Sequence, residues 1–442
     1  MRFIVAPLER FFLRWVPDAF VVAILLSLVT FGLAMGVQGY SVGDTITSWG
    51  DGFWNLLTFT NQITLTLLLG FALANTPAMR AGFAKCATFV NSPFAAYASA
   101  CFITGVCALF SWGLSLIAAG IVPRYIGDSC RERGIKIHYP MLVASAFSGF
   151  AVWHQGLSSS IGLAIATPGH PLEDTIGLIP TSETIFTTWN IASALAVLCI
   201  LPFAMAWIRP KDDDEIHELS PDHFPPETKA AGKPDITPAD RLENSRIATF
   251  TLIGCGLVYI YVHFIQRGDG LTLNIFNFAF LIVGLLMAGS MKKYIDIILE
   301  GGRIAVPFLL QYPFYAGIAA VMQDSGLANL VIEGFVSVSS AATLPLFGFF
   351  SGGLVNLFIP SGGGQWAVQG PIMMGAAQEL GADIPRVAMG VALGDQWTNL
   401  VHPLTLIPVT ALARIQPKEI MSFCFMALIF TGIMFTIVLI PF

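Results

Sequence analysis

The sequence predicts an all-α, polytopic membrane protein, with transmembrane segments numbering about eleven. Of its 442 residues, 55% are hydrophobic and only 11% are charged, and the mean hydropathy is +0.72. Soluble domains usually carry roughly 25% charged residues. Apolar segments of about 20 residues, the length that crosses a bilayer as a helix, recur along the chain. The alternating segments of about 10 residues that are typical of outer-membrane barrels are absent from the sequence.

The first half, residues 1–208, is predicted to hold a run of spans. Residues Met1 to Trp15 carry three arginines before a long apolar run without a clear cleavage site, so we interpret the start as an uncleaved first span. The expected segments are 16–37, 53–75, a hairpin over about 93–126 that is interrupted at Ser111, Trp112 and Gly113, a span over 140–166 that is interrupted at His154, Gln155 and Gly156, and 184–208.

The composition changes abruptly over residues 209–246. This segment holds 16 of the 50 charged residues and six prolines, so we interpret it as a solvated cytoplasmic linker. Near its end, the sequence Thr237-Pro-Ala-Asp240 predicts a capped surface helix that leads into the next span, with Pro at the first helical position and an acid at the third.

The second half, residues 247–442, is predicted to repeat the order of the first. We expect spans over 247–266, 272–290 and 300–323, a hairpin over about 328–378, a span over 386–412 that is interrupted around Asp395, Gln396 and Trp397, and a last span over 418–441. The hairpin contains an uncharged run from Leu344 to Gln378 that is broken at Pro360, Ser361 and three glycines. Proline removes a helix donor and glycine costs about 1 kcal/mol per residue in a helix.

The positions of Lys and Arg predict that both hairpins are re-entrant. Positive charge concentrates in cytoplasmic loops. If each hairpin returns to the side it entered from and the N-terminus is cytoplasmic, the outer loops collect only Arg267 and Arg386. The first hairpin then opens to the cytoplasm, the second opens to the outside, and the C-terminus is periplasmic. The two halves would therefore form inverted repeats, which are typical of secondary transporters with a binding site at mid-membrane.

Several motifs resemble those of the short-chain fatty acid transporter family. They are Trp49-Gly-Asp-Gly-Phe-Trp-Asn-Leu-Leu57, Ala166-Thr-Pro-Gly-His-Pro171 with Gly177-Leu-Ile-Pro180, Pro360-Ser-Gly-Gly-Gly-Gln-Trp366 with Gln369-Gly-Pro371, and Gln396-Trp397 with Asn399. The resemblance extends over essentially the whole chain. It implies uptake of acetoacetate and butyrate, and membership of the larger ion-transporter superfamily. It further implies a homodimer in the bacterial inner membrane that moves an elevator-type transport domain against a scaffold.

The broken segments supply the candidate substrate site. A short-chain carboxylate at mid-membrane needs hydrogen-bond donors, and helix N-termini with glycines and hydroxyls can provide them. The candidates in the two hairpin tips are Ser111, Trp112, Gly113, Ser361, Gly362, Gly363, Gly364 and Gln365. The candidates in the two interrupted spans are Gln155, Ser158, Ser159, Ser160, Gln396 and Asn399.

A second set of residues could carry the coupling ion, H⁺ or Na⁺. Asp395 is the carboxylate that the predicted layout places at mid-membrane, and it could take a proton or ligate Na⁺ with backbone carbonyls. His402 lies close enough for a local pair with Asp395, and His154 interrupts the other broken span. Structural roles for all three residues remain open. No motif for a cofactor, a structural metal or a nucleic acid is present in the sequence.

Three rival functions remain open at this point. A carrier of another organic anion, such as a dicarboxylate, would profit from mid-membrane cations, which the sequence nearly lacks. An intramembrane enzyme would need a nucleophile–base pair or a metal cluster. A channel would not show saturable uptake that depends on an ion gradient. We therefore expect a symporter for short-chain monocarboxylates and not an enzyme.

Overall fold

The computed structural model of the chain describes residues 19–210, 216–220 and 237–440. The described residues are helical and include no strand, which confirms the all-α class. The predicted positive N-terminal segment, Met1 to Trp15, lies outside the described residues.

The first half contains helices that follow the predicted segments closely. Their bounds are α2 (Ala19–Gln38), α3 (Val42–Gly52), α4 (Leu57–Asn75), α5 (Pro77–Thr88), α6 (Pro93–Phe110), α7 (Trp112–Glu132), α8 (Tyr139–Ser148), the 3₁₀ helix η1 (Gly149–Gln155), α9 (Ser160–Ala164), α10 (Glu173–Ile176), η2 (Thr181–Glu183) and α11 (Thr188–Trp207). The predicted interruption of 140–166 is present, because η1 and the turn after it separate α8 from α9.

The second half begins at a short surface helix. Its bounds are α12 (Pro238–Glu243), α13 (Arg246–Tyr261), the π-helical turn η3 (Val262–Gln266), α14 (Leu273–Ala288), α15 (Met291–Asp324), α16 (Leu327–Val338), α17 (Leu344–Asn356), α18 (Gly362–Leu380), α19 (Ile384–Asn399), α20 (Pro403–Ala413) and α21 (Pro417–Leu439). The predicted span 300–323 is the C-terminal part of the long helix α15, which continues through Pro307 and Pro313.

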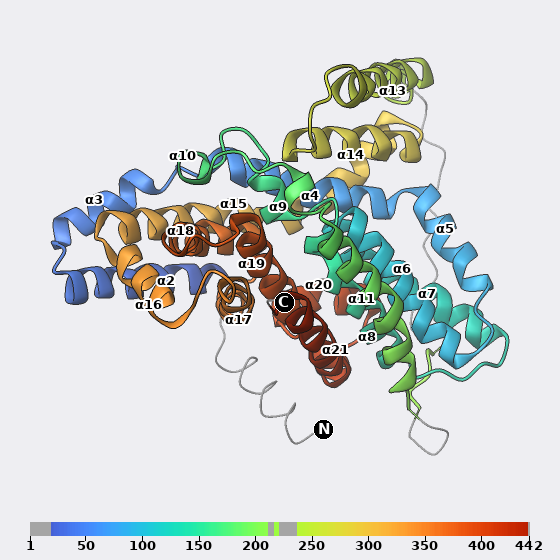
Figure 1. Cartoon of the computed structure of the whole chain (residues 1–442). Helices are drawn as coiled ribbons and strands as arrows, with labels where there is room; N and C mark the ends of the chain where they lie inside the picture. The colour runs from blue at the N-terminus through green and yellow to red at the C-terminus, as the bar shows by residue number, and fades with distance from the viewer. Residues whose placement is uncertain (1–18, 211–215, 221–236, 441–442) are drawn as a thin grey trace.

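Two groups of helices meet across the centre of the molecule. α15 packs against α2, α3 and α4, while α6, α7, α8 and α11 form a second group with η1. Figure 1 shows α17, α19 and α21 in front, and α13 with α14 projecting at the top. α18 contacts both α15 and α19, and η1 contacts α19, so the broken segments lie where the two groups meet.

Fewer helices than predicted are long and apolar enough to cross a membrane. Within the described residues there are seven such helices. The number is eight if the pair Leu273–Ala288 and Met291–Arg303, which is bent by 119° at the break between them, counts as one span. The expected scale of about eleven included the broken segments. α8, with 10 residues, and α17, with 13, are too short at 1.5 Å per residue to cross a core of about 30 Å unaided.

The second predicted hairpin differs from the structure in its extent. The range 328–378 contains three helices, because Ser339 ends α16 and a turn separates it from α17. The helix–break–helix unit is α17 with α18. The three glycines do not form the break: they form the first turn of α18, where backbone N–H groups need no intrahelical partner. The break covers residues 357–361.

The interruption predicted around Asp395, Gln396 and Trp397 is also displaced. α19 continues through these residues to Asn399, and the break covers residues 400–402, directly before Pro403 opens α20. Proline is tolerated in a first helical turn but disfavours a helical conformation in the residue before it. The polar residues therefore lie on a regular helix, where Asp395 and Asn399 are one turn apart.

Part of the linker packs on the rest of the molecule. Leu219 is only 4% exposed, and the N–H of Tyr139 donates to the carbonyl of His217 at 2.8 Å. The interpretation of 209–246 as a solvated linker therefore does not hold for Leu219, whose apolar side chain is buried. The predicted cap is confirmed: Thr237 and Asp240 form a reciprocal capping box, and the Thr237 hydroxyl and amide hold the pKa of Asp240 below its usual value.

Candidate functional site: a cavity between two helix breaks

The first helix break is Ser111, between α6 and α7, and we give the name tip 1 to Ser111, Trp112 and Gly113, the break and the start of α7. Ser111 is fully buried and its hydroxyl accepts a hydrogen bond from the Leu114 amide at 3.5 Å, as a helix N-cap does. The Trp112 amide donates to the Ser158 hydroxyl at 2.8 Å. A Cβ on Gly113 would lie 2.9 Å from the carbonyl oxygen of Leu67, so only glycine lets this tip approach α4 so closely.

The second break covers residues 357–361, and we give the name tip 2 to Ser361 to Gly364, the cap and first turn of α18. Ser361 caps α18 through the Gly364 amide at 3.4 Å, and the Tyr312 hydroxyl lies 2.8 Å from its Oγ atom. A Cβ on Gly362 would lie 2.5 Å from Ser160 Oγ and 2.6 Å from His154 Nε2. Tip 2 therefore rests directly on the interrupted span of the first half.

Beneath tip 2 lies a fully buried pair of titratable side chains. His154 Nε2 is 3.1 Å from Asp395 Oδ2, and neither side chain is exposed. Asn399 Nδ2 also donates to Asp395 Oδ2 at 3.3 Å, and His154 Nδ1 lies 3.1 Å from the Ser159 hydroxyl. The other carboxylate oxygen, Asp395 Oδ1, is buried without a hydrogen-bond partner among the described residues. It can therefore accept a proton or a cation.

Amides on three helices hold this pair in place. Gln396 Oε1 accepts from the His154 amide at 2.8 Å, which fixes η1 against α19. The side-chain nitrogen of Asn356, the last residue of α17, has two protons to donate and lies 3.0 Å from the Asp395 carbonyl, 3.0 Å from Thr398 Oγ1 and 2.8 Å from Asn399 Oδ1. Buried polar groups that are bonded in this way define one arrangement of the helices.

A cavity of about 250 Å³ lies between the two tips. Its polar lining comes from side chains of five segments, and the described residues that line it include no Lys, Arg, Asp or Glu. Its apolar walls combine aromatic, aliphatic and proline side chains. The lining residues are Ile63, Leu67, Trp112, Leu116, Phe150, Trp153, Ser160, Pro307, Phe308, Gln311, Tyr312, Pro360, Ser361, Gly362, Gly363, Asn399, Thr405 and Pro408.

The structure brings six of the fourteen residues predicted for the substrate site to the lining of this cavity. They are Trp112, Ser160, Ser361, Gly362, Gly363 and Asn399. Ser159 and Gln396 bind His154. Ser111 and Gly113 belong to tip 1 but do not line the cavity, and Ser158 accepts a hydrogen bond from the Trp112 amide of that tip.

Four predicted residues lie apart from the cavity lining. Gln365 donates to the Gly352 carbonyl at 3.0 Å and to Gln369 at 2.8 Å, and Gly364 packs against Tyr315. Gln155 exchanges bonds with Asn190 on α11. The histidine that pairs with Asp395 is His154 and not the neighbouring His402, because the continuous helix α19 directs Asp395 toward η1.

Other residues of the site were not predicted. Tyr312, Phe308, Phe150 and Trp153 contribute the aromatic walls. Tyr312 follows Gln311, a polar residue in an apolar span of the sequence. Two neighbouring hydrogen-bonding side chains in such a span could have indicated a contribution of this helix to the site. The aromatic walls carry no such signal, because aromatic residues are equally frequent in any apolar helix.

The fold is that of a class of solved membrane transporters. The structure resembles the Alcanivorax borkumensis YdaH transporter with a TM-score of 0.63 and 14% identity, covering 96% of this chain and 98% of that one. It also resembles Neisseria gonorrhoeae MtrF, which is described within a class of antimetabolite efflux pumps, with a TM-score of 0.56 and 14% identity over 99% and 97% of the two chains.

Sequence comparison defines the family more narrowly. Residues 1–442 match the family described as short chain fatty acid transporter. A relative from Escherichia coli (strain K12) is 36% identical over 433 residues, and one from Haemophilus influenzae (strain ATCC 51907 / DSM 11121 / KW20 / Rd) is 35% identical over 439, each with 97% of both chains covered. Both carry the provisional name of short-chain fatty acid transporter. The chain belongs to the short-chain fatty acid transporter family, as the sequence motifs predict.

Proposed function

We propose that the protein is a secondary active transporter that imports short-chain monocarboxylates, such as acetoacetate or butyrate, by symport with H⁺ or Na⁺. The observation that carries this proposal is a largely apolar cavity without charged side chains in its lining, one of whose lining residues, Asn399, is bonded to the buried His154–Asp395 pair. Family membership supports the substrate class.

The cavity suits a small carboxylate with an apolar tail. Ser361, Gly362 and Gly363 belong to the N-terminal end of α18, where free amides and the helix dipole favour an anion. Trp112 and Phe308, whose ring centroids are 6.0 Å apart, form an apolar wall for the tail. The lining offers no fixed cation for a second carboxylate, which favours a monocarboxylate over a dicarboxylate.

The same chemistry explains why an ion would accompany the substrate. Moving an uncompensated anion into a site of low dielectric constant is costly. Asp395 is the nearest carboxylate to the cavity, because its Oδ2 atom is bonded to Asn399, which lines it. A proton or Na⁺ taken up at the free Oδ1 atom would neutralise Asp395 and lower the cost of the second negative charge.

In this account both helix–break–helix units are re-entrant and related by an inverted repeat in the bacterial inner membrane, with the N-terminus cytoplasmic and the C-terminus periplasmic. Alternating access would move the domain that holds both tips against a scaffold, in an elevator-type motion within a homodimer. Contacts of α18 with both α15 and α19 support a site at the boundary between the two parts.

The test is uptake into proteoliposomes with a pH gradient and a Na⁺ gradient imposed separately. We expect saturable uptake of butyrate or acetoacetate that requires one of the two gradients and exceeds uptake of succinate. Preferential succinate uptake would contradict the substrate class, and uptake that neither saturates nor needs a gradient would indicate a channel.

A further inference from the structure

A second cavity lies one helical turn from the first. It has a volume of about 200 Å³, and three helices line both cavities. On each of these helices, the residue that lines the second cavity is four positions from one that lines the first, which is about one turn. The pairs are Phe59 and Ile63 on α4, Ala316 and Tyr312 on α15, and Ala367 and Gly363 on α18. The two cavities are therefore stacked along the same helices.

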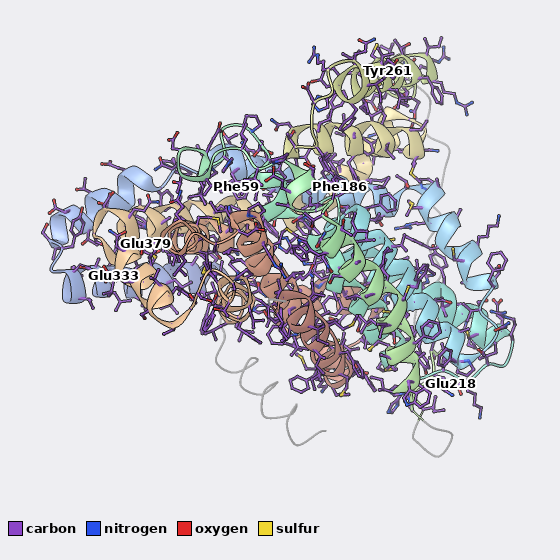
Figure 2. The ribbon with its side chains drawn as sticks, viewed as in Figure 1. Phe59, Phe186, Glu218, Tyr261, Glu333 and Glu379 are labelled. Carbon is purple, nitrogen blue, oxygen red and sulfur yellow. The ribbon has the colours of Figure 1, made fainter. Side chains whose placement is uncertain are left out.

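Three residues separate the two cavities. The rings of Phe59 and Tyr312 have centroids 6.0 Å apart, and both side chains are buried. A Cβ on Gly363 would lie 2.6 Å from the Tyr312 hydroxyl and 3.0 Å from Phe59 Cζ. The Phe59 and Tyr312 side chains thus pack directly against the backbone of Gly363. Together these residues form a barrier between the cavities that is one side chain thick. Figure 2 labels Phe59 on α4, away from the exposed Glu333 and Glu379 at the periphery.

The second cavity communicates with the protein surface. Asn55, Pro171 and Gln323 line it and are exposed. Gln323 lies in the last turn of α15, so the opening is at the C-terminal end of that helix. The residues of α15 that line the first cavity, from Pro307 to Tyr312, lie near the middle of the helix, on the N-terminal side of those that line the second cavity. The barrier therefore lies between the candidate site and one surface of the protein.

We propose that Phe59, Tyr312 and Gly363 form a gate, and that the second cavity is the chamber through which the substrate passes between the site and that surface. The proposal deepens the proposed transport function and rests on it. The gate must open for a carboxylate to cross, because these three residues lie in mutual contact between the two cavities.

The geometry also connects the gate to the substrate. The Tyr312 hydroxyl is hydrogen-bonded to Ser361, which lines the site. The Ser361 hydroxyl has one proton to donate and already accepts from the Gly364 amide. A carboxylate that accepts a hydrogen bond from the Ser361 hydroxyl leaves Tyr312 as the donor in its bond to Ser361. Substrate binding therefore fixes the direction of the hydrogen bond that holds the gate residue in place.

Thiol labelling in membrane vesicles tests the gate without requiring transport. The exposed cysteines Cys86, Cys199 and Cys255 are first replaced by serine. Reporters are then introduced in the chamber, as Ala319→Cys, and in the site, as Gln311→Cys. We expect an impermeant thiol reagent to label the chamber reporter from one face and to label the site reporter poorly from that face. Adding Phe59→Ala should raise labelling of the site reporter from that face by at least about fivefold, because a gate residue controls access.

Phe83→Ala is the matched control, since Phe83 is 4% exposed and Phe59 is 5% exposed, and Phe83 lines neither cavity. It should leave the labelling rate unchanged. Equal labelling of Gln311→Cys with and without Phe59→Ala, or no labelling of Ala319→Cys from either face, would overturn the gate. Because labelling does not depend on a substrate, failure of butyrate uptake would contradict the proposed function and leave this result interpretable.

A second variant keeps the test independent of the loss of a large side chain. Gly363→Ala places a methyl group between Tyr312 and Phe59. It should wedge the barrier and raise labelling of Gln311→Cys from the chamber face by at least about twofold. Gly375→Ala, on the same helix, meets the Ile332 side chain, whose terminal Cδ1 at 2.6 Å is the nearest atom and whose Cγ1 lies at 3.3 Å, and should leave labelling at the parent rate. Equal rates in the two glycine variants would contradict the role of Gly363.

Discussion

Both tips consist of a serine cap and the first residues of the helix after a break, but their surroundings differ. At tip 1 the break is a single residue, Ser111, which is fully buried, and the Trp112 amide that follows it donates to the Ser158 hydroxyl. Tip 2 follows a break over 357–361, its Ser361 lines the cavity, and its Gly362 rests on His154 of the buried pair. The difference indicates that tip 2 offers hydrogen-bond donors to a substrate and adjoins the His154–Asp395 pair, while tip 1 supplies an apolar wall through Trp112.

The largest expected effect lies under tip 2. Asp395→Asn removes the carboxylate that pairs with His154, so no carboxylate is left at this position to bind the coupling ion. We expect gradient-driven butyrate uptake to fall roughly 100-fold, the factor that corresponds to about 3 kcal/mol for breaking a buried pair. Uptake assays in proteoliposomes, with the protein amount matched by size-exclusion chromatography, measure this loss. Uptake at the wild-type rate would exclude Asp395 as the coupling residue.

The contact between tip 2 and the pair can be broken sterically. Gly362→Ala would place a Cβ 2.5 Å from Ser160 Oγ and 2.6 Å from His154 Nε2. We expect uptake to fall by about 10-fold or more, since each 1.4 kcal/mol of misplacement corresponds to a factor of about 10. Gly375→Ala, later in the same helix, is the control and should transport normally. If both variants transport equally well, close contact at Gly362 is unimportant.

The serines at the two tips allow a direct comparison. Ser361→Ala removes a hydroxyl that lines the cavity, and we expect KM for butyrate to rise about 10-fold, as for a hydrogen bond to a charged group. Ser111→Ala removes a buried helix cap, so it should lower thermal stability, by about 1 kcal/mol, more than it changes KM. Concentration-dependent uptake and thermal unfolding separate the two effects. A larger KM change in Ser111→Ala would reverse the assignment of the tips.

The smallest effect is expected at the apolar wall. Trp112→Phe enlarges the cavity at tip 1 while keeping an aromatic ring. Pentanoate, which has one methylene more than butyrate, should gain relative to butyrate by about fivefold, because one methylene in an apolar pocket corresponds to roughly 1 kcal/mol. Competition of unlabelled acids against labelled butyrate measures the shift. An unchanged order of preference would mean that Trp112 does not contact the tail.

The sequence predicted what depends on composition and local chemistry. The all-α class, the break at Ser111, the interrupted span near His154 and the capping box at Thr237 follow from apolar length, polar interruption and cap residues, which act locally. The position of the break after Asp395 was missed because one proline, Pro403, determines it, while the polar residues before it fit a regular helix. The polar pattern alone could not distinguish these two arrangements.

Residues that meet only in three dimensions were harder to predict. The pairing of Asp395 with His154 joins residues 241 positions apart, and the contact of Tyr312 with Ser361 joins two helices 49 positions apart. Helical periodicity gives the face of each helix but not its partner. Gln365 illustrates the reverse case, because a polar residue next to the glycines satisfies a backbone carbonyl of α17 and does not reach the cavity.

A structure of the protein with a bromine-tagged butyrate would test the division between the tips most directly. The account predicts that the carboxylate lies within hydrogen-bond distance of Ser361 Oγ and that the anomalous signal of the bromine lies against Trp112. A bromine signal at Ser361, with the carboxylate at tip 1 or outside the cavity, would contradict it.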